Sequence, residues 1–291
     1  MPELPEVETI RRDLQETILN RPIAQVEILL KKICKNPLSV FEKNLKNKSF
    51  KNILRRGKLL IFELNSCSNF LTVHLRMTGQ LIFKNKNNFI VGGHSEPQLK
   101  KDFPNSYTHF ILTFKDQSQL FFNDLRQFGF LQIVSPEDLE KILAKFGVEP
   151  FSDDFTYKNF EKIILSKKEK NIKSFLLDQS FIAGIGNIYA DEILFAAELS
   201  PHNKVKDLTD LQIKKIFKFI KIILEKAIKS RGTTFNNFVD TKGRTGNFLK
   251  FLQVYSRGGQ ACLRCGQLLR KEKMRGGGLF GVWGVRGERC Y

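Results

Sequence analysis

The first apolar residues of the chain recur at the spacing of an α-helix. Between residues 3 and 19, acids alternate with apolar residues so that one face carries Val7, Ile10, Leu14 and Ile18. Pro5 falls near the first turn, where a missing amide hydrogen is tolerated, and the acids gathered there suit the positive end of the helix dipole. The pattern predicts a helix over residues 3–19.

Between residues 23 and 134 the pattern changes to short runs typical of β-strands. In chain order these runs are QVEILL, KLLIFEL, NFLTVHL, THFILTF, SQLFFN and FGFLQIV. Gly, Asn, Ser and Asp separate them, which predicts an antiparallel sandwich or barrel. Residues 84–106 are polar and contain Gly and Pro, so we expect a long loop there.

From residue 147 onward the apolar spacing is helical again. The stripe of one long helix, which ends at Gly232, consists of Ile213, Ile216, Phe217, Ile220, Ile223, Leu224, Ala227 and Ile228. We therefore expect a domain boundary near residue 150. The predicted domains are an N-terminal sheet domain over residues 1–150, a helical domain over residues 151–252 and a C-terminal segment over residues 253–291.

The composition is that of a folded, strongly basic protein. The 48 Lys and Arg against 30 Asp and Glu give a net charge of +18, and 42% of the residues are hydrophobic. This charge indicates a polyanionic partner, nucleic acid before a membrane surface, although lysine as a mere solvating residue fits the composition equally well. No apolar run is long enough to cross a bilayer. Five scattered cysteines and a start without a secretory signal favour a reducing cytoplasm.

The residues directly after Met1 offer a possible nucleophile. If Met1 is removed, Pro2 becomes a secondary amine with a pKa of about 8, against about 10.4 for lysine, so much more of it is neutral at pH 7. Its attack on an aldehyde-level carbon gives an iminium, which is an electron sink, and the adjacent Glu3 can act as acid or base. Taken alone, however, the stretch is better explained as a helix lead-in.

Six stretches of the sequence, taken together and in order, favour the nucleophile over the helix lead-in. MPELPEVETIRR is followed by RRGKLLIFEL, VHLRMTGQL, NDLRQFGF, AGIGNIYADE and LQVYSRGGQACLRCG. Together they resemble the formamidopyrimidine-DNA glycosylase and endonuclease VIII family over nearly the whole chain. The segment GTTFNNFVDTKGRTGNFLKFLQVY looks more like the formamidopyrimidine branch, which acts on oxidised purines. The resemblance implies an α+β fold: an N-terminal antiparallel β-sandwich with flanking helices, a helix-two-turn-helix domain and a zinc-finger-like β-hairpin, here degenerate.

The resemblance also implies a role for each matching residue. Pro2 becomes the nucleophile and Glu3 the proton carrier, and Lys58 takes the position of the catalytic lysine. The residues expected to fill the DNA helix are Met77, Arg126 and Phe128, and those expected to contact the DNA are Tyr107, Lys168, Lys173 and Asn187. By themselves Met77 and Phe128 are better explained as core residues, Lys58 as a solvated lysine and Asn187 as a helix cap. We expect His74 and His109 to be structural.

The C-terminal segment departs from the family pattern. The family has two CxxC pairs that bind zinc, but here Cys262 and Cys265 form one pair and the only later cysteine is Cys290. The finger arginine that holds the DNA has its nearest candidate in Arg275. The glycine-rich composition after about residue 274 suggests a shifted reading frame or an eroded terminus. Zinc is therefore expected from the family but not from this donor set.

The predicted activity is that of a bifunctional DNA glycosylase and abasic-site lyase. It would remove oxidised purines, such as 8-oxoguanine and formamidopyrimidines, from double-stranded DNA through a Schiff base on Pro2, and cut the strand by β,δ-elimination. Two alternatives remain: a glycosylase for oxidised pyrimidines, and a DNA-binding relative inactivated by loss of its finger. We expect a monomer in the bacterial cytoplasm, with no membrane partner and with salt-sensitive DNA binding.

Overall fold

The computed structural model describes residues 1–66, 68–86, 89–93, 103–233, 248–274 and 279–283. The chain divides into two compact units: Met1–Ala144 with Ile228–Leu249, and Lys145–Ala227 with Lys250–Tyr291. The first boundary lies close to the predicted position near residue 150. Residues 228–249 return to the first unit, which differs from the predicted 151–252 domain. The C-terminal segment is grouped with the second unit.

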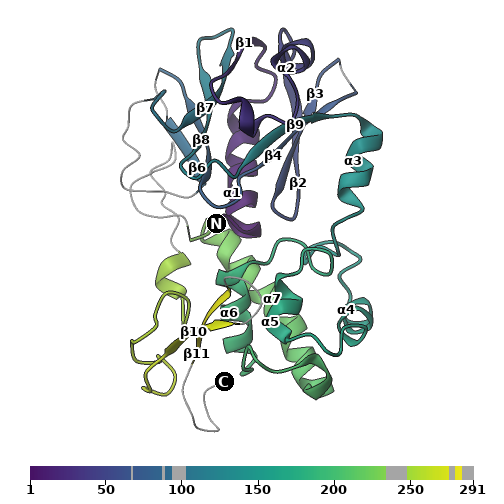
Figure 1. Cartoon of the computed structure of the whole chain (residues 1–291), viewed down its shortest axis with the longest axis vertical. Helices are drawn as coiled ribbons and strands as arrows, with labels where there is room; N and C mark the ends of the chain where they lie inside the picture. The colour runs from purple at the N-terminus through teal and green to yellow at the C-terminus, as the bar shows by residue number, and fades with distance from the viewer. Residues whose placement is uncertain (67, 87–88, 94–102, 234–247, 275–278, 284–291) are drawn as a thin grey trace. The chain divides into compact units, whose positions relative to one another are not determined.

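The first helix, α1 (Leu4–Thr17), confirms the prediction from the apolar spacing. The carboxylate of Glu6 accepts a hydrogen bond from the backbone amide of Glu3 at 2.9 Å, so an amide at the helix start finds a partner. Val7, Ile10 and Leu14 are buried. In Figure 1, α1 is the purple helix of the first unit, and it contacts strands of both sheets of that unit.

Two antiparallel sheets form the sandwich of the first unit. The five-stranded sheet has the order β1 (Ile23–Ile28), β7 (Thr108–Phe114), β8 (Gln119–Asp124), β5 (Gly79–Lys84) and β6 (Phe89–Gly93). The four-stranded sheet has the order β2 (Phe50–Arg56), β3 (Leu59–Leu64), β4 (Phe70–His74) and β9 (Phe130–Val134). Residues of α1 and both sheets share one hydrophobic core, which includes Val7, Phe62 and Phe122. The predicted sandwich is confirmed.

Several elements of this unit were not expected from the sequence. All six predicted runs are strands, but β2, β5, β6 and the helix α2 (Leu38–Leu45) were missed. The predicted loop over residues 84–106 is wrong in part, because β6 lies inside it and pairs with β5, with Ile82 opposite Val91. Polar and glycine residues surround this short run, so its local signal is weak and the hairpin partner decides its conformation. The unit also contains the 3₁₀ turn η1 (Lys31–Ile33) and the helix α3 (Pro136–Leu143).

The second unit is helical and carries a terminal hairpin. Its helices are α4 (Tyr157–Leu165), α5 (Ile172–Leu177), α6 (Asn187–Ala196) and the main part of α7 (Asp210–Lys229), with the 3₁₀ turn η2 (Val205–Asp207). The 3₁₀ turn η3 (Phe248–Phe251) begins in the part of the chain that belongs to the first unit and ends in the second. The buried residues of α7 are Ile213, Ile216, Ile220, Leu224 and Ala227, all members of the predicted stripe. The strands β10 (Arg270–Met274) and β11 (Leu279–Trp283) pair in antiparallel orientation, and the backbone of β11 lies close to α6. No helix in the described part of the chain is long and apolar enough to span a membrane.

Candidate functional site

Lys58 and the start of the chain form one buried cluster in the first unit. Lys58 follows Gly57, whose φ of +57° closes the turn between β2 and β3, and its side chain is buried. Burial lowers the pKa of Lys58, against the negative charges of Glu3 and Glu6, and the charge of Arg76 lowers it as well. Burial likewise lowers the pKa of the Met1 amine, and the negative charges of Glu3 and Glu6 partly oppose this shift. The same two carboxylates, those of Glu3 and Glu6, therefore interact electrostatically with both the Met1 amine and Lys58.

Glu6 links this cluster to a distant part of the chain. Besides the amide of Glu3, its carboxylate accepts hydrogen bonds from the backbone nitrogen of Thr233 at 2.8 Å and from the Thr233 hydroxyl at 3.0 Å. Gly232, with φ of +75°, lies so close that an added Cβ would meet Glu6 Oε1 at 2.7 Å. The sequence signal for Glu6 was only its place in PELPE, and its contact with Thr233 was not predicted.

A second acid of α1 supports the turn that carries Lys58. Glu8 accepts hydrogen bonds from Arg11 and Arg12 on its own helix and from Arg55 Nε at 3.0 Å. Arg55 also donates to the carbonyl of Gly57 at 3.0 Å, so it joins α1 to the residue before Lys58. Burial alone would raise the pKa of Glu8, but these hydrogen bonds and charges outweigh burial and lower it to about 2. The sequence analysis missed Glu8 and Arg55.

The topology places Met77 beside Arg126 and Phe128. Met77 lies in the connection from β4 to β5, and the other two lie in the connection from β8 to β9. β4 pairs with β9, and β5 pairs with β8, in antiparallel orientation. Both connections therefore cross from one sheet to the other at the same end of these strands, which we call the shared edge of the sandwich. The guanidinium carbon of Arg126 lies 4.8 Å from the centre of the Phe128 ring. Met77 is 39% exposed and Phe128 is 52% exposed. Neither is therefore a core residue, although its residue type alone favoured that interpretation.

The two histidines near this edge have protein partners. His74 Nδ1 accepts a hydrogen bond from the backbone nitrogen of Arg76 at 3.0 Å. Burial, together with the charges of Arg76 and Lys58, lowers the pKa of His74 to about 3, so it is neutral at pH 7. His109 Nε2 lies 2.8 Å from the carbonyl oxygen of Asp124. Both arrangements agree with the structural role that we expected.

Four further residues were expected to contact DNA, and one of them is placed otherwise. Lys173 is 0% exposed and its ammonium lies 2.6 Å from Asp191 Oδ1. A fully buried, ion-paired lysine does not reach a phosphate at the surface, so we correct that prediction: Lys173 joins α5 to α6. Lys168 is exposed and Tyr107 is half-buried, which leaves both accessible.

Asn187 begins α6 directly after a glycine-rich turn. Gly184 has a φ of +103° and Gly186 is the residue that caps the helix. The side-chain oxygen of Asn187 is buried and makes no hydrogen bond within the described residues. This position combines a side-chain amide with the N-terminal end of a helix, where the helix dipole favours an anion.

The cysteines of the second unit retain one half of a metal knuckle. The backbone nitrogen of Arg264 lies 3.4 Å from Cys262 Sγ, and Gly266 has the positive φ (+76°) that closes the turn after Cys265. Within the described ranges no group of three or more potential metal ligands comes together. Two thiols do not complete the four-ligand site that structural zinc requires. Cys290 and Arg275, the remaining candidates, lie outside the described residues.

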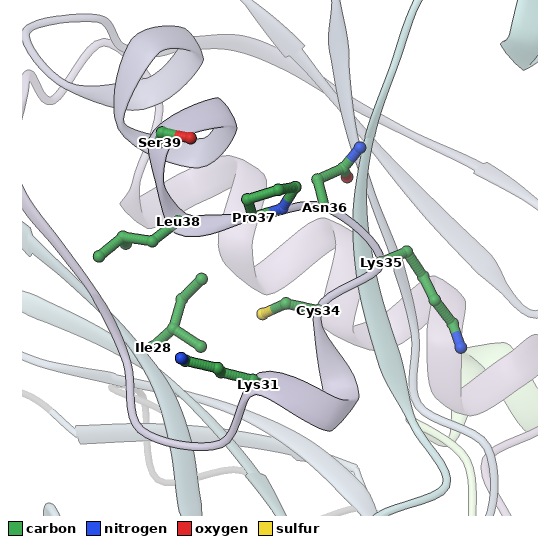
Figure 2. A pocket seen from close by; sticks show the side chains of 8 residues that line it. All are labelled: Ile28, Lys31, Cys34, Lys35, Asn36, Pro37, Leu38 and Ser39. Carbon is green, nitrogen blue, oxygen red and sulfur yellow. The ribbon is translucent and has the colours of Figure 1, made fainter.

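A separate cavity lies elsewhere in the first unit. Its volume is about 660 Å³, and Figure 2 shows its lining from the end of β1, η1 and the start of α2, including Lys31, Cys34 and Leu38. Burial raises the pKa of the Cys34 thiol to about 12, so this thiol is not a nucleophile at neutral pH. None of the predicted site residues lines it.

The comparisons with known proteins identify the family. The model of the formamidopyrimidine-DNA glycosylase N-terminal domain matches residues 1–131, and the model of the H2TH domain of formamidopyrimidine-DNA glycosylase matches residues 146–239. Formamidopyrimidine-DNA glycosylases of Pelotomaculum thermopropionicum and Carboxydothermus hydrogenoformans are each 41% identical to the chain, over 95% of it and over 95% and 96% of their own lengths. The chain belongs to the formamidopyrimidine-DNA glycosylase family.

Solved structures agree with this assignment. A complex of the Lactococcus lactis Fpg with DNA containing an abasic site has a TM-score of 0.82 and 33% identity, and the match covers 96% of this chain and 97% of that one. A structure of MutM in complex with DNA containing carbocyclic 8-oxo-G has a TM-score of 0.81 and 34% identity, with the same coverage. The predicted family and fold class are therefore confirmed. Members of this family are DNA glycosylases of base excision repair with lyase activity, and they generally bind zinc.

Proposed function

We propose that this chain is a bifunctional DNA glycosylase and abasic-site lyase whose nucleophile is Pro2, exposed as a free amine when Met1 is removed. The observation that carries the proposal is the buried cluster of the terminal amine, Lys58, Glu3 and Glu6. Burial lowers the pKa of Lys58 and of the Met1 amine, and Pro2, whose amine becomes free when Met1 is removed, is buried next to it in the chain. A lowered pKa raises the neutral fraction that a nucleophile or base needs. The two carboxylates supply the acid–base capacity beside it.

The reaction begins with a substitution at the sugar. The Pro2 nitrogen bonds to C1′ of the extruded nucleotide and loses its proton, and the bond from C1′ to the base breaks, so that the base leaves with the electron pair and takes up a proton. The bond from C1′ to the ring oxygen then opens, that oxygen receives a proton, and a cationic iminium forms. Glu3 carries protons at the sugar, while Lys58 assists protonation of the leaving groups.

The iminium drives strand cleavage. Loss of a C2′ proton sends an electron pair toward C3′ and expels the 3′-phosphate in the β-elimination. Loss of a further proton then expels the 5′-phosphate in the δ-elimination, and water hydrolyses the iminium to restore Pro2. Each step needs a proton acceptor within reach of the sugar, and Lys58, with its lowered pKa, suits that task.

We propose that Met77, Arg126 and Phe128 occupy the space in the DNA helix from which the nucleotide is extruded. An enzyme that extracts a base has to prevent collapse of the stack, and an unbranched thioether, a planar guanidinium and an aromatic ring suit insertion. Their shared edge and the exposure of Met77 and Phe128 support this role. Asn187, Lys168 and Tyr107 are the proposed contacts to the DNA backbone.

The proposed substrates are oxidised purines in double-stranded DNA. The solved relatives include complexes with DNA that contains Fapy-dG and with DNA that contains carbocyclic 8-oxo-G, which supports this branch for the present chain. The curated relatives named above are bacterial proteins, so we expect the enzyme to act in a bacterial cytoplasm. We also expect it to bind DNA as a monomer. The net charge of +18 predicts binding that weakens steeply with salt.

A zinc ion would have a structural role only, and the described residues provide two of its ligands. Cys262 and Cys265 have the turn geometry of a zinc-binding knuckle and are the residues that would hold the metal, with Cys290 as the remaining thiol of the chain. Bound there, the ion would stabilise the hairpin by cross-linking it. The donor set in the described residues falls short of four ligands, so no step of the reaction depends on the metal.

The decisive test is covalent trapping. Protein whose Pro2 is verified as the free N-terminus is incubated with a duplex that contains 8-oxoguanine, at low salt and with borohydride, which reduces an iminium to a stable amine. We expect a cross-linked adduct and strand cleavage. Protein that keeps Met1 or an N-terminal tag should form none. Absence of an adduct with verified Pro2 would contradict the proposal and favour a DNA-binding relative without catalysis.

Two controls sharpen this test. Lys58→Met should slow excision and elimination, whereas Lys51→Met, which removes an exposed lysine from the neighbouring β2, should leave both at the level of the unmodified enzyme. Duplexes containing an oxidised pyrimidine measure the lesion preference. Adducts with these duplexes but none with 8-oxoguanine would identify the alternative branch of the family.

A further inference from the structure

The two connections that carry Met77, Arg126 and Phe128 are joined by a buried hydrogen bond. The hydroxyl of Thr78, directly after Met77, donates to Asp124 Oδ1 across 46 residues of sequence. Thr78 is 7% exposed and Asp124 is 0% exposed, so water does not compete for this bond. The same hydroxyl accepts a hydrogen bond from the backbone nitrogen of Arg126 at 3.0 Å.

Asp124 also shapes the turn that contains Arg126 and Phe128. Its carboxylate accepts from the backbone nitrogens of Arg126 at 3.2 Å and Gly129 at 2.7 Å, and its carbonyl accepts from Gln127 at 3.3 Å. Gln127 has a φ of +56°, a conformation that a residue without glycine's freedom adopts only when neighbours hold it there. The turn is therefore built around one carboxylate.

Thr78 lies at the end of its connection, directly before Gly79, and Gly79 pairs with Asp124 at the start of the other connection. The connections begin and end at paired strand residues, His74 with Phe130 and Gly79 with Asp124. The Met77 segment is itself closed by a hydrogen bond from Gly79 N to the Leu75 carbonyl at 2.9 Å. The side chain of Thr78 then links this segment to Asp124 and to Arg126 of the other connection.

From this geometry we propose that Thr78 is a positioning residue that couples Met77 to the Arg126–Phe128 turn, so that the three side chains enter the DNA as one preassembled wedge. The inference rests on the proposed function, because it assumes that these side chains fill the helix. Three side chains on two independent segments would each have to find the correct position on binding. The Thr78–Asp124 link fixes their relative placement in the free protein, and a supporting hydrogen bond of this kind is what keeps an inserted group in register.

The test compares substrates that do and do not require the wedge. Thr78→Val keeps the shape but removes the hydroxyl. We expect single-turnover excision from an 8-oxoguanine duplex to fall about ten- to hundred-fold. Cleavage of a single-stranded oligonucleotide with an abasic site leaves no helical gap to fill, and it should stay within about two-fold of the unmodified enzyme. Thr78→Ser, which retains the hydroxyl, should restore duplex activity.

A matched control separates coupling from general stability. Thr72 in β4 is equally buried and its hydroxyl donates to the Gln132 carbonyl at 3.1 Å, away from both connections. Thr72→Val should therefore lower duplex and single-strand activity together, if it lowers either. If Thr78→Val does not fold, Thr78→Ala, which removes volume and cannot clash, takes its place. Equal losses on the two substrates for the Thr78 variants would overturn the coupling.

A second readout follows the wedge directly. With 2-aminopurine opposite the lesion, insertion changes its fluorescence, and we expect a slower or smaller change with Thr78→Val than with Thr72→Val. Met77→Ala and Phe128→Ala test the underlying assumption. Duplex-specific losses in these two but not in Thr78→Val would refute the coupling alone. No duplex-specific loss in any of them would refute the wedge and the coupling together, while Pro2 trapping would still stand as the test of the reaction.

Discussion

Glu6 and Thr233 are hydrogen-bonded twice, although 227 residues separate them in sequence. The carboxylate that receives these bonds also receives the amide of Glu3 and acts on the terminal amine and Lys58 through its charge. One side chain thus connects the start of the chain, the proposed catalytic lysine and Thr233. Two of the predictions below follow from this contact.

Glu6→Gln should move the acid limb of the pH–rate profile to lower pH. The negative charge of Glu6 raises the pKa of both the Met1 amine and Lys58, against the lowering by burial, and we expect the same direction for the Pro2 amine. Removal of this charge lets these pKa values fall further, so the neutral forms persist to lower pH. Single-turnover rates measured across the pH range test this. Glu16→Gln removes the same charge from an exposed position of α1 and should not move the limb. An unmoved limb, or a shift to higher pH, in Glu6→Gln would contradict the prediction.

Gly232→Ala should lower the free energy of unfolding by more than the same substitution at another glycine with positive φ. A Cβ at Gly232 would lie 2.7 Å from Glu6 Oε1, and its φ is +75°. We expect a loss of about 1 kcal/mol from the backbone conformation and about 1–3 kcal/mol from overpacking, together with lower activity. Gly259→Ala is the matched control, because Gly259 has a φ of +82° and nothing within 4 Å of an added Cβ. Denaturant unfolding compares the two, and equal losses would show that contact with Glu6 has no effect.

Glu8→Gln should reduce stability at neutral pH but not in strong acid. The pKa of Glu8 is lowered from 4.5 to about 2, so its ionised form stabilises the fold above pH 4.5 and this contribution disappears as the pH falls through about 2. The shift corresponds to ~3 kcal/mol at neutral pH. Urea unfolding at a series of pH values measures the difference between variant and unmodified protein. Glu42→Gln, at an exposed position, should show no such pH-dependent difference.

Lys173 and Lys168 should respond in opposite ways to the same substitution. Lys173→Met leaves Asp191 as a buried charge without its ion partner and should cost about 3–5 kcal/mol of stability. The double variant Lys173→Met with Asp191→Asn should recover a large part of this loss. Lys168→Met should leave stability unchanged but weaken DNA binding and reduce its salt dependence. Thermal unfolding and binding titrations at several salt concentrations distinguish these outcomes. Unchanged stability in Lys173→Met would contradict the buried-pair assignment.

Much of the secondary structure follows from the sequence because its causes are local. The helix of residues 3–19 has apolar side chains at helical spacing and a proline suited to its first turn, so α1 was predictable. The six strand runs are likewise dense in residues that pack well on a pleated surface. The run Phe89–Gly93 has a weak local signal, and its partner β5 makes it a strand. Pairing is a tertiary event, which is why β6 was missed.

The candidate site divides in the same way. The chemistry proposed for Pro2, Glu3 and Lys58 depends on residue type, so the sequence and its family resemblance were enough to predict it. Lys168 and Lys173 look alike in KKEKNIK, and only the packing of α5 against α6 buries one of them on Asp191. The contact of Thr78 with Asp124 likewise requires two sheets whose connections cross at one edge. Side-chain identity thus set what the residues can do, and tertiary packing decided which of them meet, because burial and partners arise only when distant segments come together.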